Sequence, residues 1–394
     1  YRVYHDSKVI EEGLRATPIV YVSGKRFTVS GTLRYFWQNC PSALQVSNTN
    51  LEISPFPRQY SDSFELQGGE QKTFSIYLNF SRNGDAEETL SWIHHPLVLS
   101  ADPQWYCNTK TLPFVIPKED IPKGFPCEDA YELVESVITG TNTFFHRRET
   151  IDEYGWRNFG DVYADHENQL FEGEKPIISH YNNQYDLINS FLTEYMRSCT
   201  RAWFTLAEEL ALHVMDLDIY HTDKDRYEYN HGLFWHTDHF CDAATSTHRG
   251  FSRMTLAQKG VSVYGGGPDY QHVYAQGLVN YYFLTGNQRA KDVVIELADY
   301  VVNGIKGPSR PITVCKKILK GIIHYLKTNF LNFNQLIPYA LTEGPGRASG
   351  NALSVLVDGY NLTGKQLYID SAEDLIKKCI HPYDNVSTRR LDDV

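Results

Sequence analysis

Long apolar runs, an excess of basic residues and paired cysteines are all missing from this chain of 394 residues. No stretch approaches the roughly 18 consecutive apolar residues of a membrane-spanning helix, so we expect no segment that crosses a bilayer. Lys and Arg number 37 against 48 Asp and Glu, which gives a net charge of −11. Such a chain lacks the clustered cations that bind a phosphate backbone and is repelled by anionic lipid, so we expect neither nucleic acid nor membrane as a partner.

The 7 cysteines are scattered and include no Cys-x-x-Cys pair, so they indicate neither a disulfide framework nor a zinc ribbon. The chain opens at Tyr1 without an initiator Met or a signal peptide, and we expect a mature, processed or truncated product. The compartment stays open on these features, with a secreted or periplasmic location favoured.

Aromatic residues are abundant instead, at 13% of the chain, and Tyr leads with 27 copies. A tyrosine has a flat apolar face and a polar tip, which suits the C–H faces and hydroxyl rims of sugar rings. A wet, half-buried core in a large helical fold explains the same composition equally well.

The first part of the chain is patterned as β-strands. Period-2 alternation and β-branched or aromatic residues predict strands at 18–23, 26–30, 32–37, 51–54, 63–66 and 73–78. Gly31 separates the second strand from the third, and residues 67–72 form a tight hairpin turn between the last two. We therefore expect an antiparallel β sandwich or barrel over residues 1–112, begun within the fold and so incomplete.

A proline-rich segment follows, and helical periodicity begins after it. Five prolines between 103 and 126 forbid a long helix, so residues 113–126 are interpreted as a linker. Residues 128–138 then place Tyr131, Val134 and Ile138 on one face of a helix.

An internal repeat predicts the architecture of residues 127–394. Leu284-Thr-Gly-Asn-Gln288 matches Leu362-Thr-Gly-Lys-Gln366, and each lies between two helical stretches. A helix, a glycine cap and a second helix form an αα-hairpin, and repeated hairpins must stack to bury their faces. An open solenoid and a closed α/α toroid both satisfy this requirement, and the less polar first helix of each pair favours the toroid. The expected fold is therefore α+β and multidomain, with a β sandwich or barrel followed by an α/α toroid.

Histidines concentrate in one region that we interpret as the walls of a cleft. Five of the 15 histidines lie between residues 221 and 248, within a polar and aromatic sequence that is unusual for a scaffold helix. Imidazole suits acid–base chemistry because its pKa lies near neutral pH. His236 and His239 could also share a helical face and bind a divalent metal, but no zinc motif is present and we favour no cofactor.

Polar segments upstream and downstream supply the other groups that a sugar acid would need. β-Elimination at a uronate requires a neutralised carboxylate, a base and an acid, whereas hydrolysis requires two carboxyl groups about 5 to 10 Å apart. Asp161, Glu167 and Asp238 could serve hydrolysis, but the richness in His, Arg and Tyr favours elimination. The candidate catalytic residues are His236, His239, Tyr185 and Tyr264. The candidate substrate-binding residues are Arg157, Asn158, Asp161, His166, Asn182, Asn183, His231, Trp235, Asp238, Arg249 and His272.

Several of these motifs carry a family resemblance. The segments 33–39, 64–73, 156–161, 230–239 and 264–268 are similar to the exo-acting rhamnogalacturonan lyase family of polysaccharide lyases. The similarity runs from about residue 15 to about residue 365, and Phe-Glu-Leu-Gln-Gly-Gly-Glu-Gln-Lys-Thr at 64–73 is its most distinctive string. The resemblance implies an N-terminal β domain, an α/α toroid and a C-terminal β domain, with cleavage of the rhamnose–galacturonic acid backbone of pectin by elimination. In this chain the helical sequence pattern continues to Cys379, so a full C-terminal β domain is not expected.

The sequence therefore predicts a polysaccharide lyase acting on an acidic, uronate-containing polysaccharide or oligosaccharide. A glycoside hydrolase on the same kind of toroid is the first alternative. A carbohydrate-binding protein without catalysis is the second.

Overall fold

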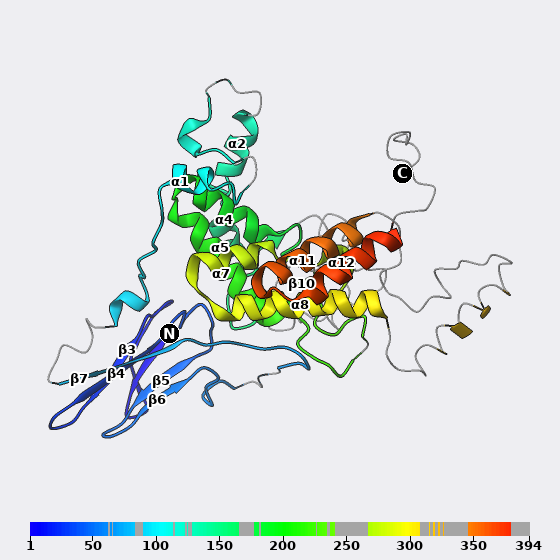
Figure 1. Ribbon diagram of the computed structural model, residues 1–394. Coiled ribbons are helices and arrows are strands. Elements are labelled where there is room, and N and C mark those ends of the chain that lie inside the picture. The colour runs from blue at the N-terminus through cyan, green and yellow to red at the C-terminus, as the bar shows by residue number, and fades with distance from the viewer. Residues whose placement is uncertain are drawn as a thin grey trace. The chain divides into compact units, whose positions relative to one another are not determined.

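The structure, a computed structural model, describes most of the chain as two compact units. Unit 1 comprises Tyr1–Gln67, Gln71–Asp161 and Glu194–Ala202, and unit 2 comprises Gly68–Glu70, Val162–Thr193 and Trp203–Val394. The described residues are 1–61, 64, 66–82, 90–112, 115–122, 124, 128–164, 177–180, 183–225, 227–234, 237–240, 267–307, 315, 318, 319, 322, 323, 326 and 346–379, with the backbone alone for 163–164, 177–180 and 237–240. Helices and antiparallel sheets both occur, which confirms the α+β class (Figure 1).

Antiparallel strands form the first part of unit 1. They are β1 (Arg2–His5), β2 (Lys8–Glu12), β3 (Ile19–Ser23), β4 (Thr28–Leu33), β5 (Ala43–Val46), β6 (Leu51–Ser54) and β7 (Ile76–Ser81). β3, β4 and β7 make a three-stranded sheet in that order, while β1 pairs with β2 and β5 pairs with β6. The antiparallel arrangement agrees with the sequence prediction, and closure into a sandwich or barrel stays a prediction.

Two details of the predicted strands are corrected by the structure. Gly31 does not end a strand, because β4 passes through it, and a Cβ atom there would lie 3.1 Å from the Leu78 side chain and 3.2 Å from Ile53. The glycine thus permits close packing and makes no turn. The hairpin predicted around 67–72 is also absent from the described residues, because β7 pairs with β4 and the carbonyl of Gly69 accepts a hydrogen bond from the His221 backbone.

Short helices complete unit 1. They are η1 (Ser91–Ile93), α1 (Pro103–Asn108), η2 (Lys118–Asp120), α2 (Glu128–Glu135) and α3 (Phe144–Ile151). α2 confirms the helical periodicity that begins at Glu128. Unit 1 extends through α2 and α3 to Asp161, so the compact units do not divide at the proline-rich segment 113–126 where we placed the linker.

Unit 2 is mainly helical. Its elements are β8 (Tyr163–Ala164), β9 (Ile177–His180), α4 (Leu187–Ser198), α5 (Arg201–His213), the π-helical turn η4 (Val214–Asp218), β10 (Thr237–Phe240), η6 (Tyr270–His272), α7 (Gln276–Thr285), α8 (Gln288–Lys306), α11 (Arg347–Thr363) and α12 (Gln366–Cys379), with the ends of α4 and α5 that face each other in the chain belonging to unit 1. β10, β9 and β8 form a small antiparallel sheet.

Both Leu-Thr-Gly segments end a helix as predicted. Gly286 caps α7 and Gly364 caps α11, each in a left-handed conformation that glycine adopts without steric cost. α7 is followed at once by α8, and α11 by α12, so both predicted αα-hairpins are confirmed. A closed toroid stays a prediction.

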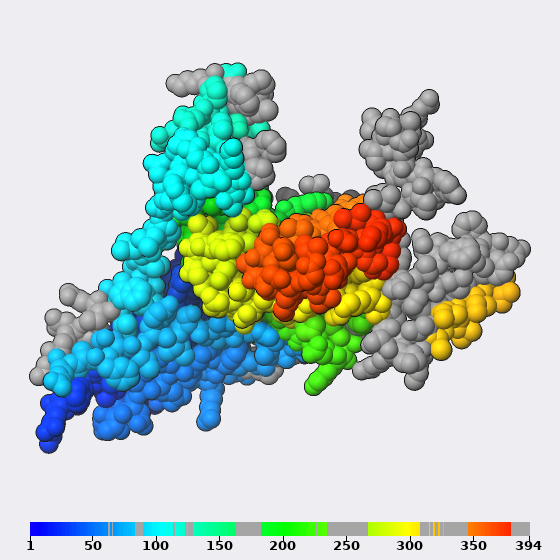
Figure 2. Space-filling view, in the orientation of Figure 1, coloured from blue at the N-terminus to red at the C-terminus, as the bar shows by residue number. Residues whose placement is uncertain are grey.

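The hairpins pack around an apolar core. α11 contacts both α8 and α12, and α7 contacts α8, as the neighbouring ribbons and surfaces show (Figures 1 and 2). Leu297 and Tyr300 of α8, Leu356 of α11 and Tyr368 of α12 are fully buried there. In the part of the chain that is described, no helix combines the length and the apolar content that crossing a membrane requires.

Candidate functional site

A strained turn lies just before α4 in unit 2. Asn183, Tyr185 and Asp186 have φ values of 57°, 59° and 57°, in the left-handed region that residues other than glycine seldom adopt. Strain of this kind costs free energy and is retained where the surrounding contacts over-determine it, often at functional sites. The turn therefore marks a candidate site, and it includes two residues that the sequence had singled out, Asn183 and Tyr185.

Buried polar groups hold this turn in place. Oδ1 of Asn183 accepts a hydrogen bond from the Ile188 backbone nitrogen at 3.0 Å and so caps the start of α4. Oδ2 of Asp186 accepts one from the backbone nitrogen of Gly277 in α7 at 2.9 Å. A Cβ atom at Gly277 would lie 2.4 Å from Oδ1 of Asp186, so only glycine allows this approach. Asn183 thus supports the turn from inside the protein.

Tyr185 is presented outward by the same turn. Its side chain is 64% exposed. The guanidinium carbon of Arg347, the first residue of α11, lies 6.0 Å from the centroid of its ring, and the ring of Tyr274 lies 6.4 Å away. Arg347 is itself exposed, at the positive end of a helix dipole. A phenol and a cation therefore face solvent side by side.

His272 lies beneath this surface. It is buried, and its Nδ1 lies 3.0 Å from Nε2 of Gln184, the remaining residue of the turn. Burial lowers the pKa of His272, which favours the neutral imidazole. When Gln184 donates to Nδ1, the imidazole proton sits on Nε2. We call Gln184, Tyr185, His272, Tyr274 and Arg347 the Tyr185 site.

Two buried acids lie within the same unit. Burial raises the pKa of Asp186 to about 6, against hydrogen bonds led by the Gly277 backbone that lower it. Burial, and then the charge of Asp186, raise the pKa of Asp358 in α11 to about 7. Two carboxyl groups that repel each other in this way favour the state in which one of them is protonated.

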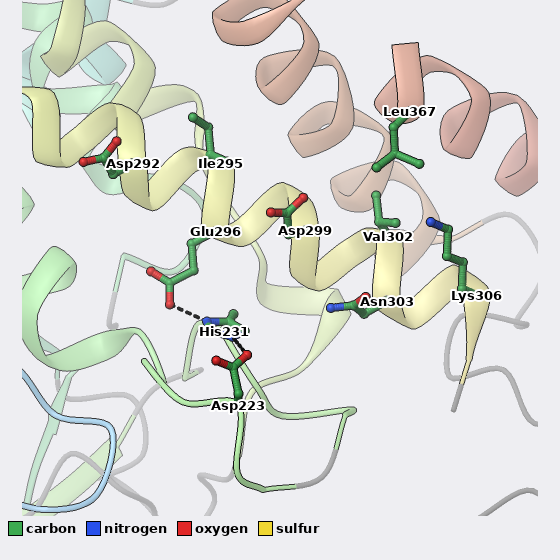
Figure 3. Close-up of a pocket in the computed structure, with 10 residues that line it drawn as sticks. All are labelled: Asp223, His231, Asp292, Ile295, Glu296, Asp299, Val302, Asn303, Lys306 and Leu367. Carbon is green, nitrogen blue, oxygen red and sulfur yellow. Dashed lines mark hydrogen bonds and ion pairs between the residues drawn. The ribbon is translucent and has the colours of Figure 1, made fainter. Parts of the chain in front are cut away.

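A second cluster forms around His231, another predicted residue. Nδ1 of His231 lies 2.6 Å from Oε1 of Glu296 in α8, and its Nε2 lies 2.7 Å from Oδ1 of Asp223 (Figure 3). His221 adds a contact of 2.9 Å from its Nδ1 to Oε2 of Glu296. We call Asp223, His221, His231 and Glu296 the Glu296 clasp. Asp223, His231 and Glu296 border a pocket of about 570 Å³ beside α8. Its lining residues are Asp223, His231, Asp292, Ile295, Glu296, Asp299, Val302, Asn303, Lys306 and Leu367.

The electrostatics of the clasp are those of an ion pair. The hydrogen bond to Glu296 raises the pKa of His231 to about 9, with a further contribution from Asp223. Burial pushes the pKa of Glu296 upward, but the hydrogen bonds from His221 and His231 outweigh it and lower the pKa to about 2. His231 is therefore an imidazolium held between two carboxylates over the whole neutral range.

The other predicted residues divide into three groups. Arg157, Asn158 and Asp161 belong to unit 1, where Asn158 and Asp161 are buried and the Arg157 guanidinium lies 4.6 Å from the Trp156 ring centroid. Asp238 and His239 lie in β10, where their Cα atoms pair with Ser179 and Ile178 of β9. Outside the described residues are Tyr264, His236, Trp235, His166, Asn182 and Arg249.

Arg347 and Glu296 were not predicted as site residues. Arg347 follows Gly344-Pro-Gly346, which is typical of a loop that leads into a helix, so its position at a helix start was readable from the sequence. Glu296 had no comparable signal, since its two histidine partners are 65 and 75 residues away in the chain.

The metal alternative concerned His236 and His239, whose side chains are not described, so it stays a prediction. Unit 2 does contain one fully buried imidazole and carboxylate, His213 and Asp218, with Nε2 and Oδ1 3.5 Å apart. Imidazole nitrogens and carboxylate oxygens are both ligands that a divalent metal accepts.

Comparisons with known proteins assign no family to this chain. No family model matches it, and no curated protein matches it either.

Proposed function

We propose that this chain is a polysaccharide lyase that cleaves a uronate-containing, pectin-like glycan by β-elimination. The single observation that carries the proposal is the exposed Tyr185 on its strained turn with the Arg347 guanidinium beside it. The family resemblance of the sequence points to the same chemistry.

The reaction needs the groups that the Tyr185 site offers. The proton on C5 of the uronate is removed, its electron pair forms the C4=C5 double bond, and the C4–O bond breaks as the departing oxygen takes a proton. A guanidinium bound to the carboxylate stabilises the enolate-like charge of the transition state. A positioned phenol can transfer a proton in that state.

We assign these roles within the site as follows. Arg347 binds the uronate carboxylate, and Tyr185 takes part in the proton transfer. Tyr274 offers a ring face to the sugar. His272 and Gln184 are buried supports that fix the orientation of Tyr185. His236, His239 and Tyr264 remain predicted partners in proton transfer, and β10 pairs His239 with Ile178 of β9, the strand that precedes the turn.

Hydrolysis is the second candidate, because the acids Asp186 and Asp358 have pKa values raised to about 6 and about 7. A glycosidase needs one such protonated acid and one carboxylate at the scissile bond. Both side chains are more than nine-tenths buried, however, while Tyr185 and Arg347 face solvent. Elimination therefore agrees better with the side chains that a polymeric substrate can contact.

The test is the product formed from a pectic polymer. The protein is mixed with rhamnogalacturonan or polygalacturonate, and ultraviolet absorbance of the unsaturated uronate is followed together with reducing ends. We expect both signals to rise together. Reducing ends without new absorbance would show hydrolysis, and binding with neither signal would show a carbohydrate-binding protein.

Arg347 has its own test within that assay. Arg347→Ala should lower kcat/KM by about 10- to 100-fold, since a charge-assisted contact worth about 1.5–3 kcal/mol is lost. Arg347→Lys keeps the positive charge but lacks the paired N–H donors of a guanidinium. Its kcat/KM should therefore lie between the values of the unmodified protein and Arg347→Ala. Equal activity of all three proteins would remove Arg347 from the proposed mechanism.

A further inference from the structure

Glu296 joins two histidines that lie far from it in the chain. Its Oε1 contacts Nδ1 of His231 at 2.6 Å and Nδ1 of His221 at 3.0 Å. Nε2 of His221 donates to the carbonyl of Met215 at 2.9 Å when it carries the proton. The carboxylate is thus the meeting point of η4, α8 and the segment that follows η4.

Both histidines belong to one closed loop, residues 219–234. Ile219 and Leu233 form a β-bridge at its neck, and the Tyr220 backbone nitrogen donates to the Gly232 carbonyl at 2.9 Å. His231 itself has a φ of 66°. A non-glycine residue in that conformation needs compensating contacts, and its two carboxylate partners provide them.

The loop leads directly to the Tyr185 site along two routes within unit 2. On the first, Phe234 bridges to Pro268, which precedes the Asp269-capped turn η6 that ends in His272, the partner of Gln184. Gly232 lies close under Pro268, since a Cβ atom there would be 2.4 Å from the proline Cβ.

The second route is through β10. The loop continues, after residues 235–236, into Thr237, whose Cα atom pairs with His180 at the end of β9. His180 lies only three positions before Asn183, where the strained turn begins. A shift of the loop would therefore reach the Tyr185 site through a strand as well as through a buried side-chain contact.

We propose that Glu296 is a positioning residue for the Tyr185 site, because its carboxylate holds His221 and His231 and thereby fixes the loop 219–234 that supports β10 and Pro268. This role of Glu296 rests on the proposed function for the activity of the Tyr185 site. The position of the loop, however, can be measured without any substrate. Glu296 itself acts through this loop and is assigned no contact with the sugar.

The charged groups around His231 determine the pH range over which the Glu296 clasp stays intact. Glu296 faces it from α8 and Asp223 from its own loop, while Asp292, Asp299 and Lys306 of α8 line the rest of the pocket and α12 contributes the apolar Leu367 (Figure 3). With Glu296 ionised above about pH 2 and His231 protonated below about pH 9, the clasp persists across the neutral range. Activity limited by the clasp should fall as the pH rises through 9.

The test is the variant Glu296→Gln, which keeps the side-chain shape and removes the charge. Its matched control is Asp292→Asn, one turn earlier on α8 and exposed in the same pocket. We expect amide hydrogen exchange in 219–234, 237–240 and 183–186 to accelerate about 10- to 100-fold in Glu296→Gln, as the loss of a charged hydrogen bond predicts. Exchange in α11 and α12 should stay as in the unmodified protein, and the NMR titration midpoint of His231 should fall.

The activity readout separates positioning from uniform destabilisation. kcat of Glu296→Gln should drop about tenfold or more with KM nearly constant, because the Tyr185 site is misplaced while the carboxylate contact of Arg347 remains. Glu296→Asp should recover part of kcat. Unchanged exchange at 183–186, equal acceleration throughout unit 2, or the same changes in Asp292→Asn would each overturn the proposal. If the unmodified protein releases no unsaturated uronate, the proposed function fails, while the exchange data still decide the role of Glu296.

Discussion

Tyr185 is the side chain on which the proposed chemistry depends most directly. Replacing it by Phe removes one oxygen from a residue that is 64% exposed, so the free energy of unfolding should change by no more than about 0.5 kcal/mol. Loss of a proton-transfer group should lower kcat by about 100-fold or more. The measurement is the initial rate of unsaturated uronate formation together with the thermal midpoint of unfolding.

Tyr360→Phe is the matched control for Tyr185→Phe. Tyr360 is an exposed tyrosine on α11, the helix that also carries Arg347. It should keep full activity. If Tyr185→Phe were as active as this control, proton transfer would have to be assigned to another group, with His239 the next candidate.

Asp358 predicts a dependence of stability on pH. The pKa values of Asp358 and Asp186 in the folded protein, about 7 and about 6, lie above the ordinary value of 3.8. Folding therefore binds protons, so this contribution to stability is complete below about pH 4 and is lost as the pH rises through 6 to 7. The free energy of unfolding should fall by about 4 kcal/mol between pH 5 and pH 8.

Asp358→Asn separates this effect from other titrations. The amide cannot ionise, so the variant should lose most of the decline in stability and exceed the unmodified protein at pH 8. Urea unfolding at the two pH values measures the difference. A variant with the same pH slope as the unmodified protein would show that the charge of Asp358 is not the cause.

The contact between α4 and α7 depends on a single glycine. Gly277→Ala would place a Cβ atom 2.4 Å from Oδ1 of Asp186 and 2.5 Å from the Asn189 nitrogen, so one of the helices must move. Overpacking of this kind destabilises by about 1–3 kcal/mol. Since Asp186 ends the turn that presents Tyr185, activity should fall as well.

Gly350→Ala in α11 tests the opposite case on the same scaffold. A Cβ atom at Gly350 meets nothing within 4 Å. Alanine stabilises a helix interior by about 0.5–1 kcal/mol relative to glycine. We expect a higher thermal midpoint for Gly350→Ala and a lower one for Gly277→Ala, and destabilisation of both would contradict the packing explanation.

The helical hairpins could be predicted from the sequence because their signals are local. A glycine after Leu-Thr sets the left-handed cap by itself, so Gly286 and Gly364 mark both hairpins without the help of any tertiary contact. The sequence around Gly31 predicted a turn as well, but this glycine serves tertiary packing. A Cβ atom there would lie 3.1–3.2 Å from the side chains of Leu78, Ile53 and Leu51. A residue that serves close packing cannot be told from one that serves a turn without the partner that approaches it.

The candidate site was predictable only in part, for the same reason. Tyr185 and His231 lie in polar stretches of sequence that are unusual for a helix, and His231 indeed lies in a charged cluster. Glu296, by contrast, sits in an ordinary amphipathic helix, and only the fold brings it to histidines 65 and 75 residues earlier. The periodicity of α8 explains which face of the helix is exposed, but it does not identify the one carboxylate on that face with two imidazole partners.

The charge of the whole chain predicts how an anionic polymer approaches it. The net charge of −11 repels a polyuronate at long range, whereas Arg347 attracts a uronate carboxylate in direct contact. Salt screens the two interactions unequally, since the screening length is about 10 Å at 0.1 M ionic strength and contact pairs lie within it. Raising NaCl from about 0.02 to 0.1 M should therefore increase kcat/KM, because the repulsion weakens more than the contact does.

Initial rates at substrate concentrations far below KM measure this balance, with a short glycan fragment that carries a single uronate as the control. The increase should be large for the polymer and small for the fragment, which carries too little charge to be repelled at a distance. Arg347→Ala should lower kcat/KM at every salt concentration and leave the relative increase for the polymer intact, because the long-range repulsion comes from the remainder of the chain. A steady fall of kcat/KM with salt in the unmodified protein would instead mean that a basic surface around the site outweighs the net charge.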